Sequence, residues 1–218
     1  MRALLLTLLA VLPLECGAAP FAVRLGEERV VLDAPAGFAD TLELGSPRLL
    51  ELAQALTSAS NRLLLFALTD GDVRRFSTGE TPEFQRYLLV GTPRALQRES
   101  LGLSQFRSQM DDAERTLGEP AAPGDVRARL GEGPVGRTIL LRKLRRTPLL
   151  FSTLSASRLP PRVEGEVEVL LYTTTLMLVR GKALTVGVYT TLRSGADEAW
   201  LVDATQRWTD DLQRMNGR

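Results

Sequence analysis

The stretch 167-VEVLLYTTTLMLV-179, with the turn 180-RGK-182 and the run 183-ALTVGVYTTL-192, decides the fold. Threonine, valine and tyrosine recur in both runs, and β-branched and aromatic side chains favour a pleated strand. Gly181 supplies the backbone freedom that a tight turn requires. The pattern predicts a long β-hairpin. Because the later part of the first strand is apolar on both faces, we expect the middle of the sheet to be covered on both sides. Gly187 indicates a bulge or the close approach of another backbone.

An amphipathic helix is expected after the hairpin, from about residue 197 to residue 215. Its apolar side chains recur three or four residues apart and form one stripe: Trp200, Ala204, Trp208, Leu212 and Met215. This spacing predicts that both tryptophans pack against the sheet, so a role in stacking on a ligand is not needed to explain them.

The residues before the hairpin predict further strands at 21–25, 29–33, 63–68, 87–90, 138–144 and 148–154. Ser46-Pro47 and Thr92-Pro93 each have the capping residue and first-turn proline that start a helix, and the second helix is expected to reach residue 117. Asp70-Gly71-Asp72 is interpreted as a solvated turn, and residues 119–136 as a loop or a short helix around residues 126–130. Consecutive strands favour an α+β fold over residues 19–218: one domain with a largely antiparallel sheet and helices packed on it.

Residues 1–18 have the layout of a secretory signal peptide. Arg2 gives a positive start, residues 3–14 are apolar apart from Thr7, and Ala18 ends a stretch of small residues. The apolar run is shorter than the about 20 residues of a membrane-spanning helix. We therefore expect export to the periplasm, cleavage after Ala18, and a mature chain that is not transmembrane. The alternative is a lipid-anchored envelope protein acylated at Cys16, although the Glu15 before it departs from the usual pattern.

Composition excludes several kinds of chemistry. The 218 residues include no histidine and one cysteine, and 27 basic against 26 acidic residues leave a net charge of +1. Ser-His-Asp and Cys-His catalysis and zinc sites of the Cys/His kind are therefore excluded. The charge balance does not indicate nucleic acid as a partner. No metal or cofactor is expected: residues 131–136 match Gly-x-Gly-x-x-Gly, but they lack the strand before and the helix after that a dinucleotide site requires.

Arg142, Lys143, Arg145 and Arg146 form the densest basic cluster of the chain. As a functional site, such a cluster is a candidate for binding an acidic partner or a phosphate-bearing group. As a structural feature, it is the solvent-facing end of a strand. The second interpretation needs no ligand.

The chain also resembles a known fold family. The segment 32-LDAPAGF-38 near the expected mature N-terminus and the closing strand-Gly-Lys-strand-helix pattern carry this resemblance. They are similar to the family that includes the photosystem extrinsic protein PsbP and the bacterial periplasmic protein DcrB, with Phe38 where tryptophan is more usual. The resemblance implies an α/β/α sandwich around an antiparallel sheet and a binding or assembly role. It implies no shared catalytic residues.

Two functions are compatible with these residues. The first is an exported, non-enzymatic binding or assembly module whose partner is an envelope protein or an acidic ligand. The second is a hydrolase that uses carboxylates alone, which needs two facing carboxyl groups about 5–10 Å apart in a cleft. Glu166 and Glu168 are its candidates, because one strand face would hold them about 7 Å apart along the strand. As a structural feature, the pair is a solvated strand edge.

Overall fold

The computed structural model describes residues 19–217, so the expected signal peptide and Cys16 lie outside the described residues. The strands are β1 Phe21–Leu25, β2 Glu28–Leu32, β3 Phe38–Asp40, β4 Asn61–Thr69, β5 Arg86–Pro93, β6 Thr138–Thr147, β7 Leu150–Leu159, β8 Glu168–Val179 and β9 Lys182–Thr191. The α-helices are α1 Pro47–Ala55, α2 Asp70–Ser77, α3 Leu103–Leu117, α4 Val126–Gly131 and α5 Gly195–Asn216. Within this part of the chain, no helix has the length and apolar character needed to cross a membrane.

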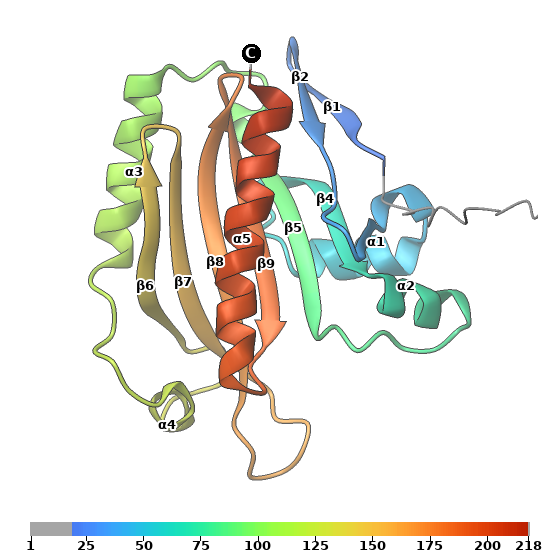
Figure 1. The fold of residues 1–218 in the computed structure, drawn as a ribbon, viewed down its shortest axis with the longest axis vertical. Coiled ribbons are helices and arrows are strands. Elements are labelled where there is room, and N and C mark those ends of the chain that lie inside the picture. The colour runs from blue at the N-terminus through green and yellow to red at the C-terminus, as the bar shows by residue number, and fades with distance from the viewer. Residues whose placement is uncertain (1–18, 218) are drawn as a thin grey trace, which may run out of the picture.

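Seven strands form one sheet in the order β3-β4-β5-β9-β8-β7-β6, and every neighbouring pair is antiparallel. Strands β1 and β2 form a separate two-stranded sheet. Helix α5 runs along one face of the large sheet, with α3 on one side of the view and α1 and α2 on the other (Figure 1). The fold is therefore α+β, as the sequence predicts.

The predicted hairpin is present as β8 and β9, and it lies at the centre of this sheet. Its register pairs Val179 with Lys182 across a two-residue turn. Both turn residues have positive φ, 49° at Arg180 and 71° at Gly181, which is the geometry whose twist matches that of the flanking strands. Along β8, buried and half-buried residues alternate without a break, so one face is fully covered and the other is only partly covered.

Helix α5 covers the buried face of the hairpin. The side chains of α5 that are buried against the sheet include Leu201, Thr205, Trp208 and Leu212. In the first half of the helix, this buried face lies one residue after the predicted stripe. Trp208 is 2 % exposed, and its indole N–H donates to the backbone carbonyl of Asp33 at 2.8 Å. Trp200 is half-buried at the edge of the same core. Its ring stacks on Phe38 with 6.3 Å between ring centroids.

The end of α5 holds the small β1–β2 sheet through one side chain. The Asn216 amide accepts from the Val31 N–H and donates to the Val31 carbonyl, both at 2.8 Å. The same side-chain NH2 group of Asn216 also donates a hydrogen bond to the Leu212 carbonyl at 2.8 Å. Asn216 therefore pairs with Val31 as a neighbouring strand would, and it fixes β2 against the last turn of α5.

Two short polar segments have a different role in the structure from the one that the sequence predicts. Asp70-Gly71-Asp72 begins α2 and is not a solvated turn: the Thr69 hydroxyl caps the Asp72 N–H at 3.1 Å, and Asp72 is buried. Thr92-Pro93 ends β5 and is followed only by a short 3-10 helix, Arg94–Leu96, in place of the predicted long helix. The Thr92 hydroxyl donates to the Ala183 carbonyl inside the sheet at 2.8 Å, and α3 begins only at residue 103.

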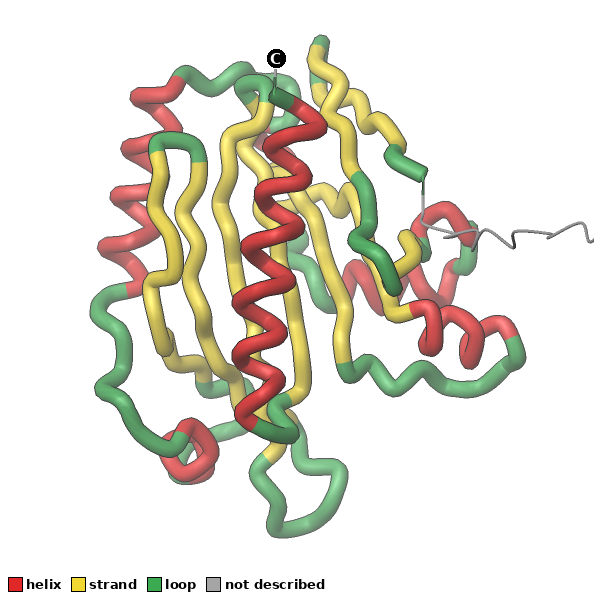
Figure 2. The backbone as a smooth tube through the Cα atoms, in the orientation of Figure 1, coloured by secondary structure: helices red, strands yellow, loops and turns green. Residues whose placement is uncertain are grey.

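The second face of the large sheet is covered in two separate parts. Helices α1 and α2 pack over β4 and β5, around Phe66 and Leu68. Helix α3 packs through Phe106 and Met110 over the other end of the sheet. The two groups of helices lie apart on either side of the view (Figure 2). The middle of β8 is half-buried between them, whereas β5, β9 and most of β7 are largely buried on both faces. The middle of the sheet is therefore covered on both sides as expected, except along β8.

Asp197 in the first turn of α5 is held by three polar groups. It accepts from the backbone N–H groups of Arg193 at 3.0 Å and Ser194 at 2.8 Å, and it pairs with Arg86 at 3.2 Å. Burial alone raises the pKa of this carboxyl, but these bonds outweigh burial and hold its pKa below the ordinary 3.8. A carboxyl with a lowered folded-state pKa adds stability above its unfolded pKa and loses it as pH falls.

We expect Asp197→Asn to lower the free energy of unfolding at neutral pH. The deficit relative to wild type should shrink as the pH falls below 3.8, because the wild-type carboxylate is then protonated as well. Urea unfolding of both proteins at neutral and at acidic pH measures this difference. A deficit that stays constant with pH contradicts the assignment.

Candidate functional site

The predicted basic cluster lies on β6, the edge strand of the large sheet. Register shifts between Leu140 and Arg142 and between Lys143 and Arg145 turn the side chains to different sides. Arg142 and Arg145 reach α5, whereas Lys143 and Arg146 reach α3. The structure therefore divides the cluster between two helices on opposite faces of the sheet.

Each of the four basic side chains pairs with carboxylates of these helices. Toward α5, Arg142 lies 3.0 Å from Glu198 and Arg145 lies 2.5 Å from Asp210. Toward α3, the pairs are Lys143–Glu114 at 3.2 Å, Lys143–Glu119 at 3.4 Å, Arg146–Glu114 at 2.5 Å and Arg146–Asp111. The hydrogen bonds that Lys143 donates to Glu114 and Glu119 raise the pKa of Lys143. The cluster is thus neutralised and fastens two helices to the edge strand.

Arg146→Ser should lower the free energy of unfolding by about 1 kcal/mol, because exposed ion pairs contribute about 0–1 kcal/mol each and this change removes two. The difference from wild type should largely disappear in molar salt, which screens exposed charges. Chemical denaturation at low and high salt measures both effects. A loss of the same size at both salt concentrations contradicts an electrostatic origin.

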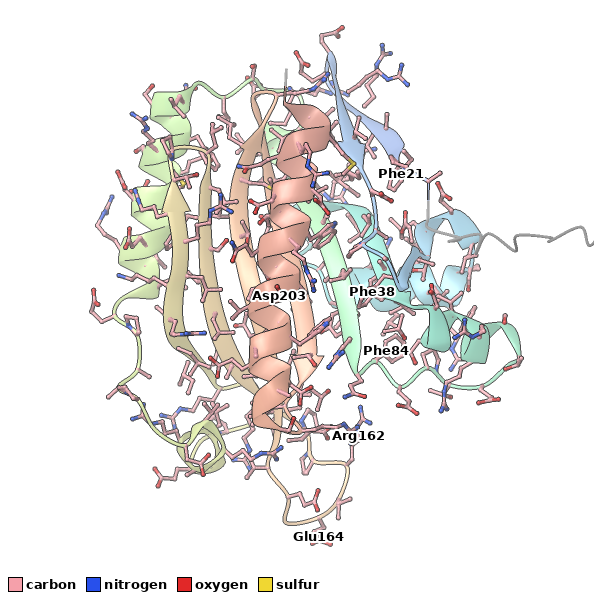
Figure 3. The ribbon with its side chains drawn as sticks, viewed as in Figure 1. Phe21, Phe38, Phe84, Arg162, Glu164 and Asp203 are labelled. Carbon is pink, nitrogen blue, oxygen red and sulfur yellow. The ribbon has the colours of Figure 1, made fainter. Side chains whose placement is uncertain are left out.

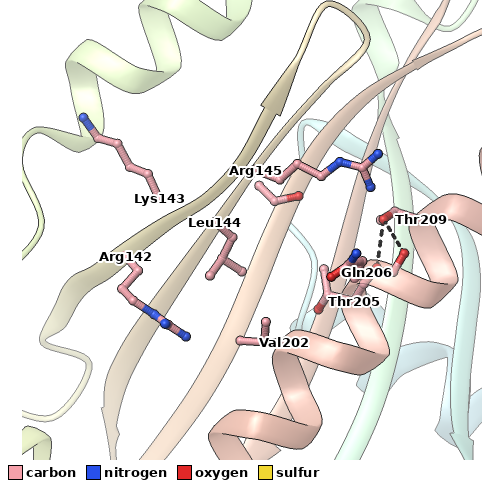
Figure 4. A pocket seen from close by; sticks show the side chains of 9 residues that line it. Arg142, Lys143, Leu144, Arg145, Val202, Thr205, Gln206 and Thr209 are labelled. Atoms are coloured by element: carbon pink, nitrogen blue, oxygen red, sulfur yellow. Dashed lines mark hydrogen bonds between the residues drawn. The ribbon is translucent and has the colours of Figure 1, made fainter.

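A groove of about 240 Å³ lies between β6 and α5, on the Arg142 and Arg145 side. In Figure 4, Lys143 points away from it and Arg145 points along it toward Thr209. The buried hydroxyls at its base are paired with one another, for example Thr205 with Thr173 at 2.6 Å. Its volume is below the about 300–1,000 Å³ of small-molecule sites. We interpret this groove as the seam between the helix and the sheet.

A larger groove of about 510 Å³ lies on the opposite face, where α3 covers only part of the sheet. We call it the α3 groove. Side chains of β6, β7, β8 and α3 line it: Thr138, Leu140, Phe151, Thr153, Ser155, Tyr172, Thr174, Leu176, Ala113, Thr116 and Leu117. These side chains are apolar, aromatic or hydroxyl-bearing, and none is charged. No local sequence pattern indicates this groove, because its lining comes from four separate elements.

A row of stacked tyrosines crosses the sheet beside the α3 groove. Tyr87, Tyr189 and Tyr172 are direct cross-strand neighbours on β5, β9 and β8. The ring centroids are 4.5 Å apart for Tyr87 and Tyr189 and 5.7 Å apart for Tyr189 and Tyr172. Burial raises the pKa of Tyr189 to about 12 and raises the pKa of Tyr87 further. Tyr87 and Tyr189 therefore stay neutral at ordinary pH, and the row ends at Tyr172, which lines the groove.

Gly187 makes room for this row. A Cβ atom at position 187 would lie 2.6 Å from Cε2 of the Tyr189 ring, which folds back over the glycine. The expected bulge or close backbone is therefore wrong: the nearest neighbour of Gly187 is the side chain two residues along its own strand.

Gly187→Ala should displace the Tyr189 ring and lower the free energy of unfolding by about 1–3 kcal/mol, the usual cost of overpacking. Near-ultraviolet circular dichroism should show a change in the tyrosine bands, since the stacking on both neighbours is disturbed. Thr185→Ala on the same strand is a control in which the bands should keep their shape. Unchanged tyrosine bands in Gly187→Ala contradict the explanation.

The two candidate carboxylates do not face each other across a cleft. Glu166 lies in the loop before β8 and is exposed, so it is not on the strand face with Glu168 as expected. Glu168, the first residue of β8, is half-buried and pairs at 3.1 Å with Arg162. Arg162 lies in the loop before β8, where Figure 3 labels it. Within residues 19–217, no group of three or more acidic, histidine or cysteine side chains is arranged to hold a metal ion.

Comparison of this chain with protein-family models, with curated proteins and with solved structures finds no match.

Proposed function

We propose that this protein is an exported, non-enzymatic binding or assembly module that holds a ligand or an envelope partner by contact. The α3 groove is the observation that supports this proposal. It has the volume of a ligand site, and its eleven lining residues contribute no carboxylate, imidazole, thiol or amine to acid–base or nucleophilic chemistry. Such a lining is suited to binding.

Export is proposed from the signal-like pattern of residues 1–18, and the resemblance to the PsbP and DcrB family is in keeping with it. The intact mass of the mature chain, isolated from the periplasmic fraction, tests the processing. Cleavage after Ala18 gives an unmodified chain that begins at Ala19. A chain that begins with an acylated Cys16 would instead establish the lipid-anchored alternative.

The carboxylate hydrolase receives no support from the placement of Glu166 and Glu168. A hydrolase needs one carboxyl group to act as an acid and a second to face it across the bound substrate. Here one candidate is held in an ion pair and the other is exposed in a loop. We therefore do not propose this activity.

Affinity purification of the tagged, full-length protein from its own periplasm tests the proposed function. The expected result is a stoichiometric small molecule or envelope protein that elutes with it and is absent from an exported tag alone. Retention of the protein in the cytoplasm contradicts the proposal. So does turnover of a glycoside substrate that Glu168→Gln abolishes.

A further inference from the structure

We infer that the α3 groove binds a small, uncharged, mostly apolar molecule that carries a hydroxyl or carbonyl group, with Ser155 as its polar anchor. This inference rests on the proposed binding function and names the class of ligand. Three features of the groove support it: the Ser155 hydroxyl at its base, the absence of charged residues in its lining, and its volume.

Ser155 offers a hydroxyl at the base of the α3 groove. Its side chain lines the groove, the residue is 5 % exposed, and its hydroxyl makes no hydrogen bond to any residue between 19 and 217. The oxygen opens onto the groove, so a ligand group there can form a hydrogen bond with it. Its neighbour Thr153 is 3 % exposed and makes only a 3.4 Å bond to the Thr174 carbonyl. The base of the groove therefore offers hydroxyls that a ligand group can satisfy.

The uncharged lining of the α3 groove disfavours a charged ligand. None of the eleven lining residues carries a charge, and the nearby Lys143 and Arg146 are already paired with carboxylates of α3. A charged ligand group that loses its water at the base would find no opposite charge there, which costs several kcal/mol. A hydroxyl or carbonyl group loses less and regains a hydrogen bond from Ser155. The ligand is therefore uncharged.

The volume and the apolar walls of the groove favour a compact, mostly apolar ligand. The groove holds about 510 Å³, within the about 300–1,000 Å³ typical of small-molecule sites. Leu117 and Ala113 of α3 face Leu140 and Leu176 of the sheet, and Tyr172 presents a ring held by the tyrosine row. A flat ring system or a short branched chain fills such a space.

Binding of two matched dyes tests the inference on the purified mature protein. N-phenyl-1-naphthylamine is uncharged and has one N–H group, whereas 1-anilinonaphthalene-8-sulfonate has the same ring system with a negative charge. We expect the neutral dye to bind with one molecule per chain and about tenfold or more tighter than the anionic dye, a preference of about 1.4 kcal/mol.

Three variants locate the site. Ala113→Phe places a ring in the α3 groove and should abolish binding of the neutral dye. Ser155→Ala should weaken it about threefold to tenfold, the effect of one hydrogen bond. Gln54→Phe places the same ring on exposed helix α1, in a groove away from α3, and should leave binding unchanged. Thermal unfolding of each variant verifies that it folds.

The outcomes separate this inference from the proposed function. Equal affinity for both dyes, or binding that persists in Ala113→Phe, overturns the inference. A wild-type dimer that Ala113→Phe converts to a monomer also overturns it, because the groove is then an interface between two copies. If the partner captured from the periplasm still elutes with Ala113→Phe, the proposed binding function stands and only the assignment to this groove fails.

Discussion

Trp208→Ala is expected to lower the free energy of unfolding by about 3–5 kcal/mol, the range for removing a buried large aromatic side chain. Trp208 is 2 % exposed and packs in the core between α5 and both sheets. The change leaves a cavity there and also removes the donor to the Asp33 carbonyl. For a chain of this length, the midpoint of thermal unfolding should fall by about 2–4 °C for each kcal/mol.

Trp200→Ala is the matched control on the same helix. Trp200 is half-buried, and it interacts through its faces with Phe38 and with the Arg86 guanidinium, whose carbon lies 4.0 Å from the ring centroid. Its removal leaves a site that water can enter, so the loss should be clearly smaller. Urea unfolding of both variants measures the difference. Equal losses would show that the core is not centred on Trp208.

Phe106→Ala is expected to have the second-largest effect, again about 3–5 kcal/mol. Phe106 is 1 % exposed and packs with Met110, Phe151 and Ala183 where α3 meets the sheet. Because α3 has few other buried side chains, its amide hydrogens should exchange much faster in the variant. The variant should also lose the wall that α3 contributes to the α3 groove, so the neutral dye should no longer bind.

Leu103→Ala on the same helix provides the control, because Leu103 is 41 % exposed. This variant should keep slow amide exchange in α3 and normal dye binding. If Phe106→Ala unfolds the whole protein at once and leaves no separate opening of α3, then α3 is not a separately docked element. Native-state hydrogen exchange distinguishes the two results.

The sequence predicts the central hairpin and α5 well, because both depend on local patterns. The alternation along residues 168–179 and the glycine at 181 specify a hairpin wherever the chain places it. The shift of the α5 stripe by one residue has a tertiary cause. Trp200 meets Phe38 and Arg86 at the border of the sheet, so the buried line passes through Leu201 instead.

Two misassigned segments show where local patterns fail. Thr92 has the residue type of a helix cap, but its hydroxyl is used by a carbonyl of the neighbouring strand β9. Asp72 has the residue type of a solvated turn, but it is buried and accepts the Glu83 N–H at 2.7 Å. In both cases a partner distant in sequence decides the role of the polar side chain. The sequence alone does not reveal that partner.

The candidate sites depend even more on distant contacts. The basic cluster is visible in the sequence, but the carboxylates that neutralise it come from α3, from α5 and from Glu119 beyond α3. The α3 groove exists because one helix is too short to cover the sheet that it packs on. Its anchor, Ser155, is an ordinary strand serine until burial and the missing partner are known.

The pairing of Asn216 with Val31 has a consequence for the order of events during biosynthesis. The second strand emerges early, yet the side chain that completes its hydrogen bonding lies at the far end of the chain. The small sheet therefore cannot reach its final position until the last helical turn has been made. The sequence separation of 185 residues between the two partners makes this pairing one of the last contacts that the small sheet can form.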